Sequence, residues 1–139
     1  MFDEIRESFR DLLHGRVPPE GRRALIASMR DTLVHARLAI DDLRDGVEAT
    51  RKRVAEERDH LETVRRRKGL AQGVGDVETV AVAERFEAQH AERLAVLEQK
   101  LAAQEGELAL VEREVAEMKE QLKAAMAGVG SGMPPGAAT

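Results

Sequence analysis

The chain has 139 residues, no cysteine and very few aromatics, which make up 2% of it and are limited to Phe2, Phe9 and Phe86. Without cysteine the chain can have neither disulfide bonds nor thiol chemistry, which suits a reducing compartment such as the cytoplasm. No apolar run approaches the roughly 20 residues that a membrane-spanning helix needs. Residues 1–13 carry charges throughout, unlike a secretory signal. Any membrane contact is therefore expected to be peripheral.

Motifs for catalysis and ligand binding are also missing from the sequence. The four histidines lack metal-ligand spacing, and the glycines at positions 69, 73 and 75 lack the lysine and hydroxyl residue of a phosphate-binding loop. The basic run at residues 65–68 has no stacking aromatic side chains near it, which favours helix capping over nucleic-acid binding. We expect no enzymatic activity, no cofactor, no metal ion, no nucleic-acid partner and no small-molecule substrate.

Charge is abundant, and it is periodic. Charged residues make up 35% of the chain. Arginine recurs every seven residues in what we call the arginine column: Arg23, Arg30, Arg37, Arg44, Arg51, Arg58 and Arg65. Apolar residues beside the column alternate in steps of three and four, which is typical of a coiled-coil seam. The column indicates a long helix with one fixed charged edge beside its apolar seam.

The pattern predicts an all-α protein: a short amphipathic N-terminal helix followed by a long antiparallel two-helix coiled-coil hairpin. Residues 1–16 form the short helix, and Pro18 and Pro19 separate it from the hairpin at residues 17–127. The arms span about residues 19–68 and 76–127, and the glycine-rich turn spans residues 69–75. Asp76 is the expected N-cap of the second arm. The Gly/Pro-rich tail, residues 128–139, is expected to be disordered.

The two arms have opposite charge, which indicates that they face each other. Residues 19–68 hold 13 basic and 10 acidic side chains, and residues 76–127 hold 6 basic and 12 acidic ones. If Gly69 lies opposite Gly75, Leu43 meets Leu101 and the column meets glutamates of the second arm, with Arg44 against Glu105. The predicted ion pairs within the hairpin use Arg37, Arg44, Arg51, Glu98, Glu105 and Glu112.

This register also predicts two places where the match fails. Lys119 would repel the arginine column instead of pairing with it. Glu57 would fall opposite Glu87 in the seam, with His90 one layer away, so that two carboxylates would resist joint ionisation.

Two further apolar faces are candidates for contact sites. The first is a candidate membrane-binding face, with a protein helix as the alternative partner: Phe2, Ile5, Phe9, Leu12 and Leu13. The second lies on the back of the second arm, where small side chains would let another helix approach, although alanine is also a good exposed helix former. We call it the small-residue strip: Ala95, Val96, Ala102, Ala103, Ala109, Leu110 and Ala116.

The order of these parts resembles the phage shock protein A family, bacterial relatives of the ESCRT-III-like membrane-remodelling proteins. The resemblance rests on the N-terminal stretch MFDEIRESFRDLL, the proline break RVPPEGRR and the stretch from Ser28 to Val34 at the start of the hairpin. It covers about residues 1–127 and corresponds to a short form without the family's C-terminal helices. The resemblance implies a scaffold that binds the inner face of the membrane and self-associates, with polymer formation as a property of the family.

Two functions follow as hypotheses. The first is a non-enzymatic membrane-surface scaffold that self-associates through the hairpin and binds bilayers through its N-terminal helix. The alternative is a cytoplasmic coiled-coil adaptor or structural protein with no membrane role. Flotation of the chain with liposomes would distinguish them.

Overall fold

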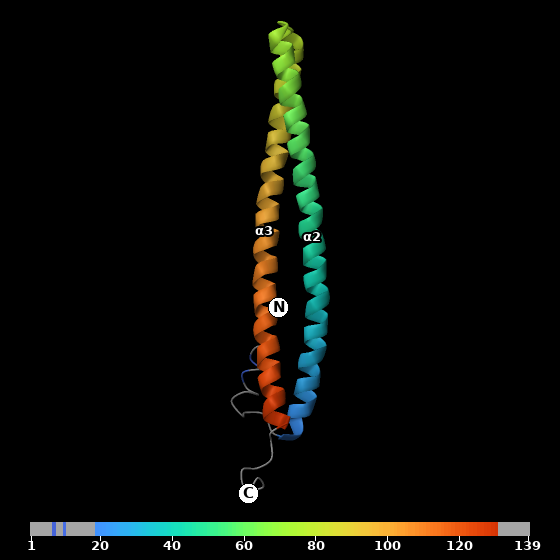
Figure 1. Cartoon of the computed structure of the whole chain (residues 1–139), viewed down its shortest axis with the longest axis vertical. Coiled ribbons are helices and arrows are strands. Elements are labelled where there is room, and N and C mark those ends of the chain that lie inside the picture. The colour runs from blue at the N-terminus through green and yellow to red at the C-terminus, as the bar shows by residue number, and fades with distance from the viewer. Residues whose placement is uncertain (1–6, 8–9, 11–18, 131–139) are drawn as a thin grey trace. The chain divides into compact units, whose positions relative to one another are not determined.

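The computed structural model describes residues 7, 10 and 19–130. This part of the chain is helical, with two long helices, α2 (Pro19–Gly73) and α3 (Val77–Gly130), packed against each other (Figure 1). The predicted all-α class and the paired long helices are confirmed. The predicted short helix at residues 1–16 and most of the predicted tail lie outside the described residues, apart from residues 7 and 10 and the last helical residues 128–130.

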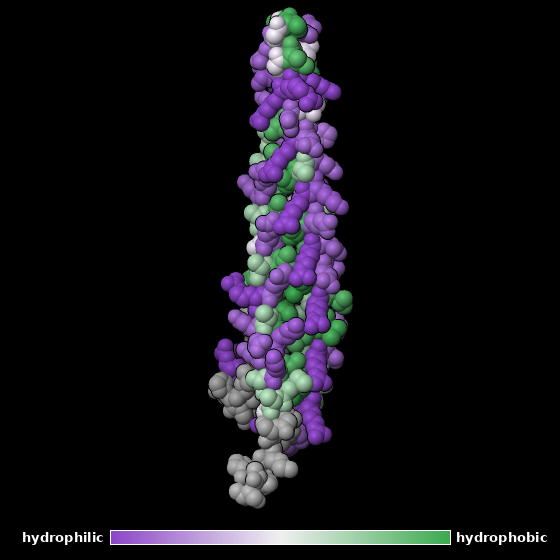
Figure 2. Space-filling model, viewed as in Figure 1, coloured by the Kyte–Doolittle hydropathy of each residue, from purple (hydrophilic) through white to green (hydrophobic). Residues whose placement is uncertain are grey.

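Contacts divide the chain into two units, and each contains a segment of α2 beside a segment of α3. Unit 1 comprises Met1–Asp42 and Leu108–Thr139, and unit 2 comprises Leu43–Glu107. In each unit the two segments bury an apolar seam and turn most of their charged residues to solvent. On the face drawn in Figure 2, apolar residues accordingly lie between hydrophilic ones.

The core of unit 1 is centred on two methionines, Met29 and Met118, which are 2% and 1% exposed. An unbranched thioether side chain fills irregular gaps between helices well. The other buried residues of unit 1 continue the predicted alternation of steps of three and four on both helices: Ile26, Leu33, Ala36, Ile40, Val111, Val115, Leu122 and Ala125. The heptad pattern therefore located this core correctly.

The core of unit 2 is thinner and contains smaller side chains. Its buried apolar residues are Val47, Val54, Leu61, Ala71, Ala83 and Leu97. Thr50 is buried among them at 3% exposure. Alanine lets the helices approach closely towards the connection between α2 and α3, while Leu43, Val64, Leu94 and Leu101 are only partly buried.

The connection between α2 and α3 is shorter than predicted, because α2 continues through Gly69 to Gly73. Gly75 has φ = 70°, a left-handed conformation that glycine adopts without steric cost. Gly75 N donates to Gln72 O at 3.3 Å, and Asp76 N donates to Ala71 O at 3.0 Å. These two bonds form a Schellman cap, which satisfies the last carbonyls of α2.

Asp76 begins α3 as its N-cap, which confirms the prediction for this residue. Its carboxylate accepts hydrogen bonds from Thr79 N at 3.1 Å and from Thr79 Oγ1 at 2.6 Å. Its carbonyl accepts the first helical bond, from Val80 N at 3.1 Å. The Thr79 hydroxyl, followed by the backbone N–H groups, lowers the pKa of Asp76 below its ordinary value.

The predicted register is wrong by one heptad. Glu105 lies beside Arg51, not beside Arg44. The reversal of the chain is centred near residue 75 instead of residue 72, so Arg51 and Arg58 meet glutamates of α3 that lie seven positions further along than predicted. A shift of one heptad keeps apolar residues opposite apolar residues, because the seam repeats with that period.

Disulfide trapping would check the corrected register in unit 2. Gly46 lies beside Gln104, and the rings of His60 and His90 stack. These two neighbouring pairs bracket Val54 and Leu97 and place both buried residues at the same level. A Val54→Cys/Leu97→Cys variant is expected to form a disulfide within one chain on mild oxidation, detectable by mass spectrometry of the monomer.

A matched control uses the register predicted from the sequence. Val47→Cys/Leu97→Cys separates the thiols by one heptad, about 10 Å along the helix, which is too far for a disulfide. Efficient trapping of this control pair within one chain would contradict the register described here.

No helix in the described part of the chain is long and apolar enough to cross a membrane.

Candidate functional site

In unit 2 the arginine column pairs with glutamates of α3. Arg51 Nη2 lies 3.2 Å from Glu105 Oε1, and Arg58 Nη2 lies 3.0 Å from Glu98 Oε1. As the residue numbers rise along α2 they fall along α3, so the segments are antiparallel. These side chains are 45–63% exposed. Exposed pairs contribute about 0.2–1 kcal/mol each, so their main effect is to select the register.

Charge reversal would measure this effect. Arg51→Glu is expected to lower the free energy of unfolding by roughly 0.5–1 kcal/mol, because two glutamates would then face each other. Adding Glu105→Arg should restore much of the loss, and Glu98→Arg should not, since Glu98 pairs with Arg58. Urea unfolding followed by circular dichroism gives the three values. Equal rescue by both second changes would show that only net charge matters.

The predicted opposition of Glu57 and Glu87 is wrong, because each carboxylate has a basic neighbour. Glu87 Oε1 lies 3.0 Å from Lys68 Nζ, and Glu87 Oε2 lies 3.3 Å from Arg65 Nε. Glu57 Oε2 lies 2.8 Å from His90 Nδ1. The one-heptad shift that moved the arginine column also separated the two carboxylates and supplied both with partners.

Two histidines lie together in this layer. The rings of His60 and His90 stack with centroids 5.3 Å apart and planes inclined by 10°. The Glu57 and His90 side chains are each 16% exposed, so their hydrogen bond is largely protected from water. It lowers the pKa of Glu57 more than any other influence; burial acts in the opposite direction, and the charges of His90, Arg93 and His60 lower this pKa further.

Acid should destabilise this layer. If two carboxylates faced each other, acid would stabilise it by relieving their repulsion. The hydrogen bond from Lys68, aided by Arg65, holds the pKa of Glu87 below its ordinary value of 4.5, and the same direction holds for Glu57. A lowered folded-state pKa stabilises the fold above the unfolded-state pKa. That stabilisation is lost as pH falls through the folded-state values.

The melting temperature is therefore expected to fall between pH 5 and pH 3, and to fall less in a Glu57→Gln/Glu87→Gln variant. A control variant, Glu56→Gln/Glu62→Gln, changes two exposed carboxylates of α2 and should keep the wild-type pH profile. A melting temperature that rises as the pH falls would instead support the arrangement in which Glu57 and Glu87 face and repel each other.

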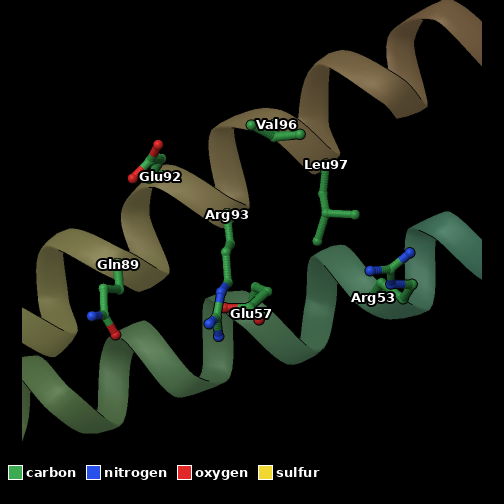
Figure 3. Close-up of a pocket in the computed structure, with 7 residues that line it drawn as sticks. All are labelled: Arg53, Glu57, Gln89, Glu92, Arg93, Val96 and Leu97. Carbon is green, nitrogen blue, oxygen red and sulfur yellow. The ribbon is translucent and has the colours of Figure 1, made fainter.

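A groove of about 490 Å³ lies beside this layer. Figure 3 shows Arg93 and Leu97 pointing from α3 towards α2, while Glu92 and Val96 point away from it. The described lining residues are Arg53, Glu57, Gln89, Glu92, Arg93, Val96 and Leu97. Among them is no Ser, Cys, Lys or Tyr that could act as a nucleophile, and the charges of both signs compensate one another. The described residues also contain no group of three or more His, Asp or Glu side chains placed to hold a metal ion.

The small-residue strip lies on the surface of α3. In unit 2, Ala95, Ala102 and Ala103 are exposed, and Val96 is 59% exposed. In unit 1 the strip continues with Ala109, Leu110 and Ala116, of which Leu110 is 47% exposed. Neither segment of the strip contributes to the seam between α2 and α3, so both are accessible to a partner helix.

The remaining predicted site residues have separate locations. The candidate membrane-binding residues Phe2, Ile5, Phe9, Leu12 and Leu13 lie outside the described residues. Arg37 lines a groove in unit 1, and Arg44 is exposed in unit 2. Glu112 is half-buried in unit 1.

The sequence interpretation missed one feature of unit 1, an apolar groove with three basic side chains: Arg30, Leu33, Val34, Arg37, Val115, Lys119 and Leu122. The sequence contains a sign of this groove, because Lys119 interrupts the acidic positions that should meet the arginine column. It was interpreted as an isolated repulsion and not as the edge of a basic site.

Comparison of the chain with protein-family models, with curated proteins and with solved structures finds no match, so the phage shock protein A family remains a resemblance carried by the sequence motifs.

Proposed function

We propose that the protein is a non-enzymatic scaffold of the membrane surface, which binds bilayers through the apolar face of residues 2–13 and self-associates through the hairpin. The observation that carries the proposal is that α2 and α3 bury each other's apolar seam residues. In unit 1, Met29 and Met118 are almost fully buried, and the flanking seam residues are at most 8% exposed. The apolar seam of unit 1 is therefore already buried by α2 and α3. The five large apolar side chains of residues 2–13 call for a different partner, and we propose that this partner is the bilayer.

The small-residue strip supports self-association. Alanine positions at helical spacing allow close approach of backbones, and the exposed Val96 and Leu110 provide apolar area for burial. A second copy of the chain is the partner we propose for this strip. In this arrangement the hairpin forms the protein contacts and residues 2–13 form the lipid contacts, which agrees with the resemblance to membrane-remodelling scaffolds at the cytoplasmic face of the membrane.

Flotation of the whole chain with liposomes tests membrane binding, and sedimentation velocity tests self-association. Val96→Glu/Leu110→Glu should lower the sedimenting mass while the helix content stays the same. Its control, Val34→Glu/Leu38→Glu, alters two exposed apolar residues of α2 that lie outside the strip. Failure to float at any vesicle curvature would exclude the membrane role.

The alternative, a cytoplasmic coiled-coil adaptor with no membrane role, is favoured by the same strip if its partner is another protein. Under that function the chain would remain in the unbound fraction with all vesicles. Residues 2–13 would then pack on a protein helix, so their deletion would change the sedimenting mass.

A further inference from the structure

We propose that the basic-rimmed groove of unit 1 binds a monomeric fatty-acid anion, with its acyl chain on the groove floor and its carboxylate at Arg37 and Lys119. The groove has a volume of about 330 Å³, within the lower range of small-molecule sites. The inference is independent of the proposed function, because it concerns a soluble ligand and the described helices, not residues 2–13.

The floor of the groove is apolar. Leu33, Val115 and Leu122 are 6–8% exposed and close the bottom, while Val34 is 59% exposed and forms one wall. Val34 is a large apolar side chain left in water, and a hydrocarbon chain laid against it would remove both surfaces from solvent. Removal of apolar area from water in this way stabilises a complex.

The rim of the groove is cationic on both sides. Arg30 and Arg37 come from α2 and Lys119 comes from α3, and none of the described lining residues carries a carboxylate. In unit 2, by contrast, glutamates meet the arginine column at Arg51 and Arg58. The groove thus lacks the anion that the column has elsewhere, and a ligand carboxylate supplies it.

The two ends of the groove are not equivalent. Arg30 Nη2 donates to Met126 Sδ at 3.4 Å, so this guanidinium is engaged beside an apolar thioether. Arg37 lies two turns further along α2, and one heptad from the Arg30–Met126 contact the antiparallel register brings Lys119 to the level of Arg37 in the same groove. We therefore assign the carboxylate to the Arg37–Lys119 end and the methyl end of the acyl chain to the Arg30–Met126 end.

The occupant must be both apolar and anionic, and it must be slender. A free inorganic anion would leave the Leu33, Val34 and Leu122 surface uncovered. A second helix, about 10 Å across with its side chains, is much wider than a single hydrocarbon chain. A linear acyl anion covers the apolar floor, places a carboxylate at the cationic rim and is slender enough for the volume of the groove.

Calorimetric titration of the full chain with sodium dodecanoate, below its micelle concentration, tests the proposal. We expect saturable binding with one site per chain and no binding of dodecyltrimethylammonium, which has the same chain and the opposite charge. Arg37→Gln/Lys119→Gln should weaken dodecanoate binding about tenfold or more, since charge-assisted hydrogen bonds to the carboxylate are lost. Val34→Asn should weaken it as well, by making the wall polar.

A matched control, Arg66→Gln/Lys100→Gln, removes one exposed cation from each helix of unit 2 and should bind like the wild type. Circular dichroism establishes that each variant is folded. Absence of saturable binding to the full chain, or equal loss in the variant and its control, would overturn the proposal. So would a change in sedimenting mass of the Arg37/Lys119 variant with unchanged dodecanoate affinity, which would assign the groove to a second copy of the chain.

Discussion

Deletion of residues 1–16 is expected to abolish flotation of the protein with small, strongly curved vesicles, while the helicity of α2 and α3 stays largely intact. Full burial of each large apolar side chain contributes about 1.5–3 kcal/mol, so partial insertion of five of them supports reversible binding. Residues 1–16 hold four acidic side chains and three arginines, and attraction to anionic lipid is therefore weak. Binding should depend on lipid packing defects and curvature more than on anionic lipid content.

A point variant with a matched control makes this experiment specific. Phe2→Ser/Phe9→Ser should lose flotation as the deletion does. Phe86→Ser makes the same chemical change at a side chain of α3 that is 49% exposed, and should float like the wild type. If the deletion instead unfolds the helices, or changes the sedimenting mass without changing lipid binding, residues 1–16 are a packing element and the adaptor function replaces the membrane one.

Replacement of Met118 by alanine should cost more stability than any surface change proposed above. Met118 is 1% exposed at the centre of the unit 1 core, and truncation of a buried methionine typically lowers the free energy of unfolding by about 2–5 kcal/mol. Part of this cost is lost burial and part is the cavity beside Met29. Urea unfolding monitored by circular dichroism measures it.

Met126→Ala is the matched control, since Met126 is in the same helix and unit but is 39% exposed. The change in the free energy of unfolding for this variant should stay within the range of ordinary surface substitutions, about 0.5 kcal/mol in either direction. Equal effects at the two positions would mean that the seam of unit 1 is loosely packed.

The heptad pattern predicted the helical class, the seam and the kind of ion pair, because each depends on which residues share a helical face. It did not predict the register, because a repeating seam is nearly indifferent to a shift of one repeat. The register between α2 and α3 depends on whether α2 continues through Gly69 and Gly73. Each glycine costs about 1 kcal/mol relative to alanine in a helix, which the surrounding helix can offset.

The predicted opposition of Glu57 and Glu87 failed for the same reason. A turn at residues 69–75 puts Glu57 opposite Glu87, whereas the continuation of α2 to Gly73 brings Glu57 beside His90. The groove at Arg37 depends on which side chains of α3 lie beside the arginine column, so it too required the register. Residues 2–13 were identified by apolar spacing alone, and the described contacts do not involve them.

The Schellman cap at Gly75 has a consequence for the order of folding. Pairs nearest this cap close short loops, with Lys68 and Glu87 separated by 19 residues, whereas Arg51 and Glu105 are separated by 54 and Arg30 and Met126 by 96. Each doubling of loop length adds about 0.6 kcal/mol of closure entropy, but once one pair has formed the next closes only a few more residues. The chain is therefore expected to zip from Gly75 outwards, with amide protection during refolding arising in unit 2 before unit 1. Nascent protein emerging from a ribosome would have to wait for α3 before any of α2 could be protected.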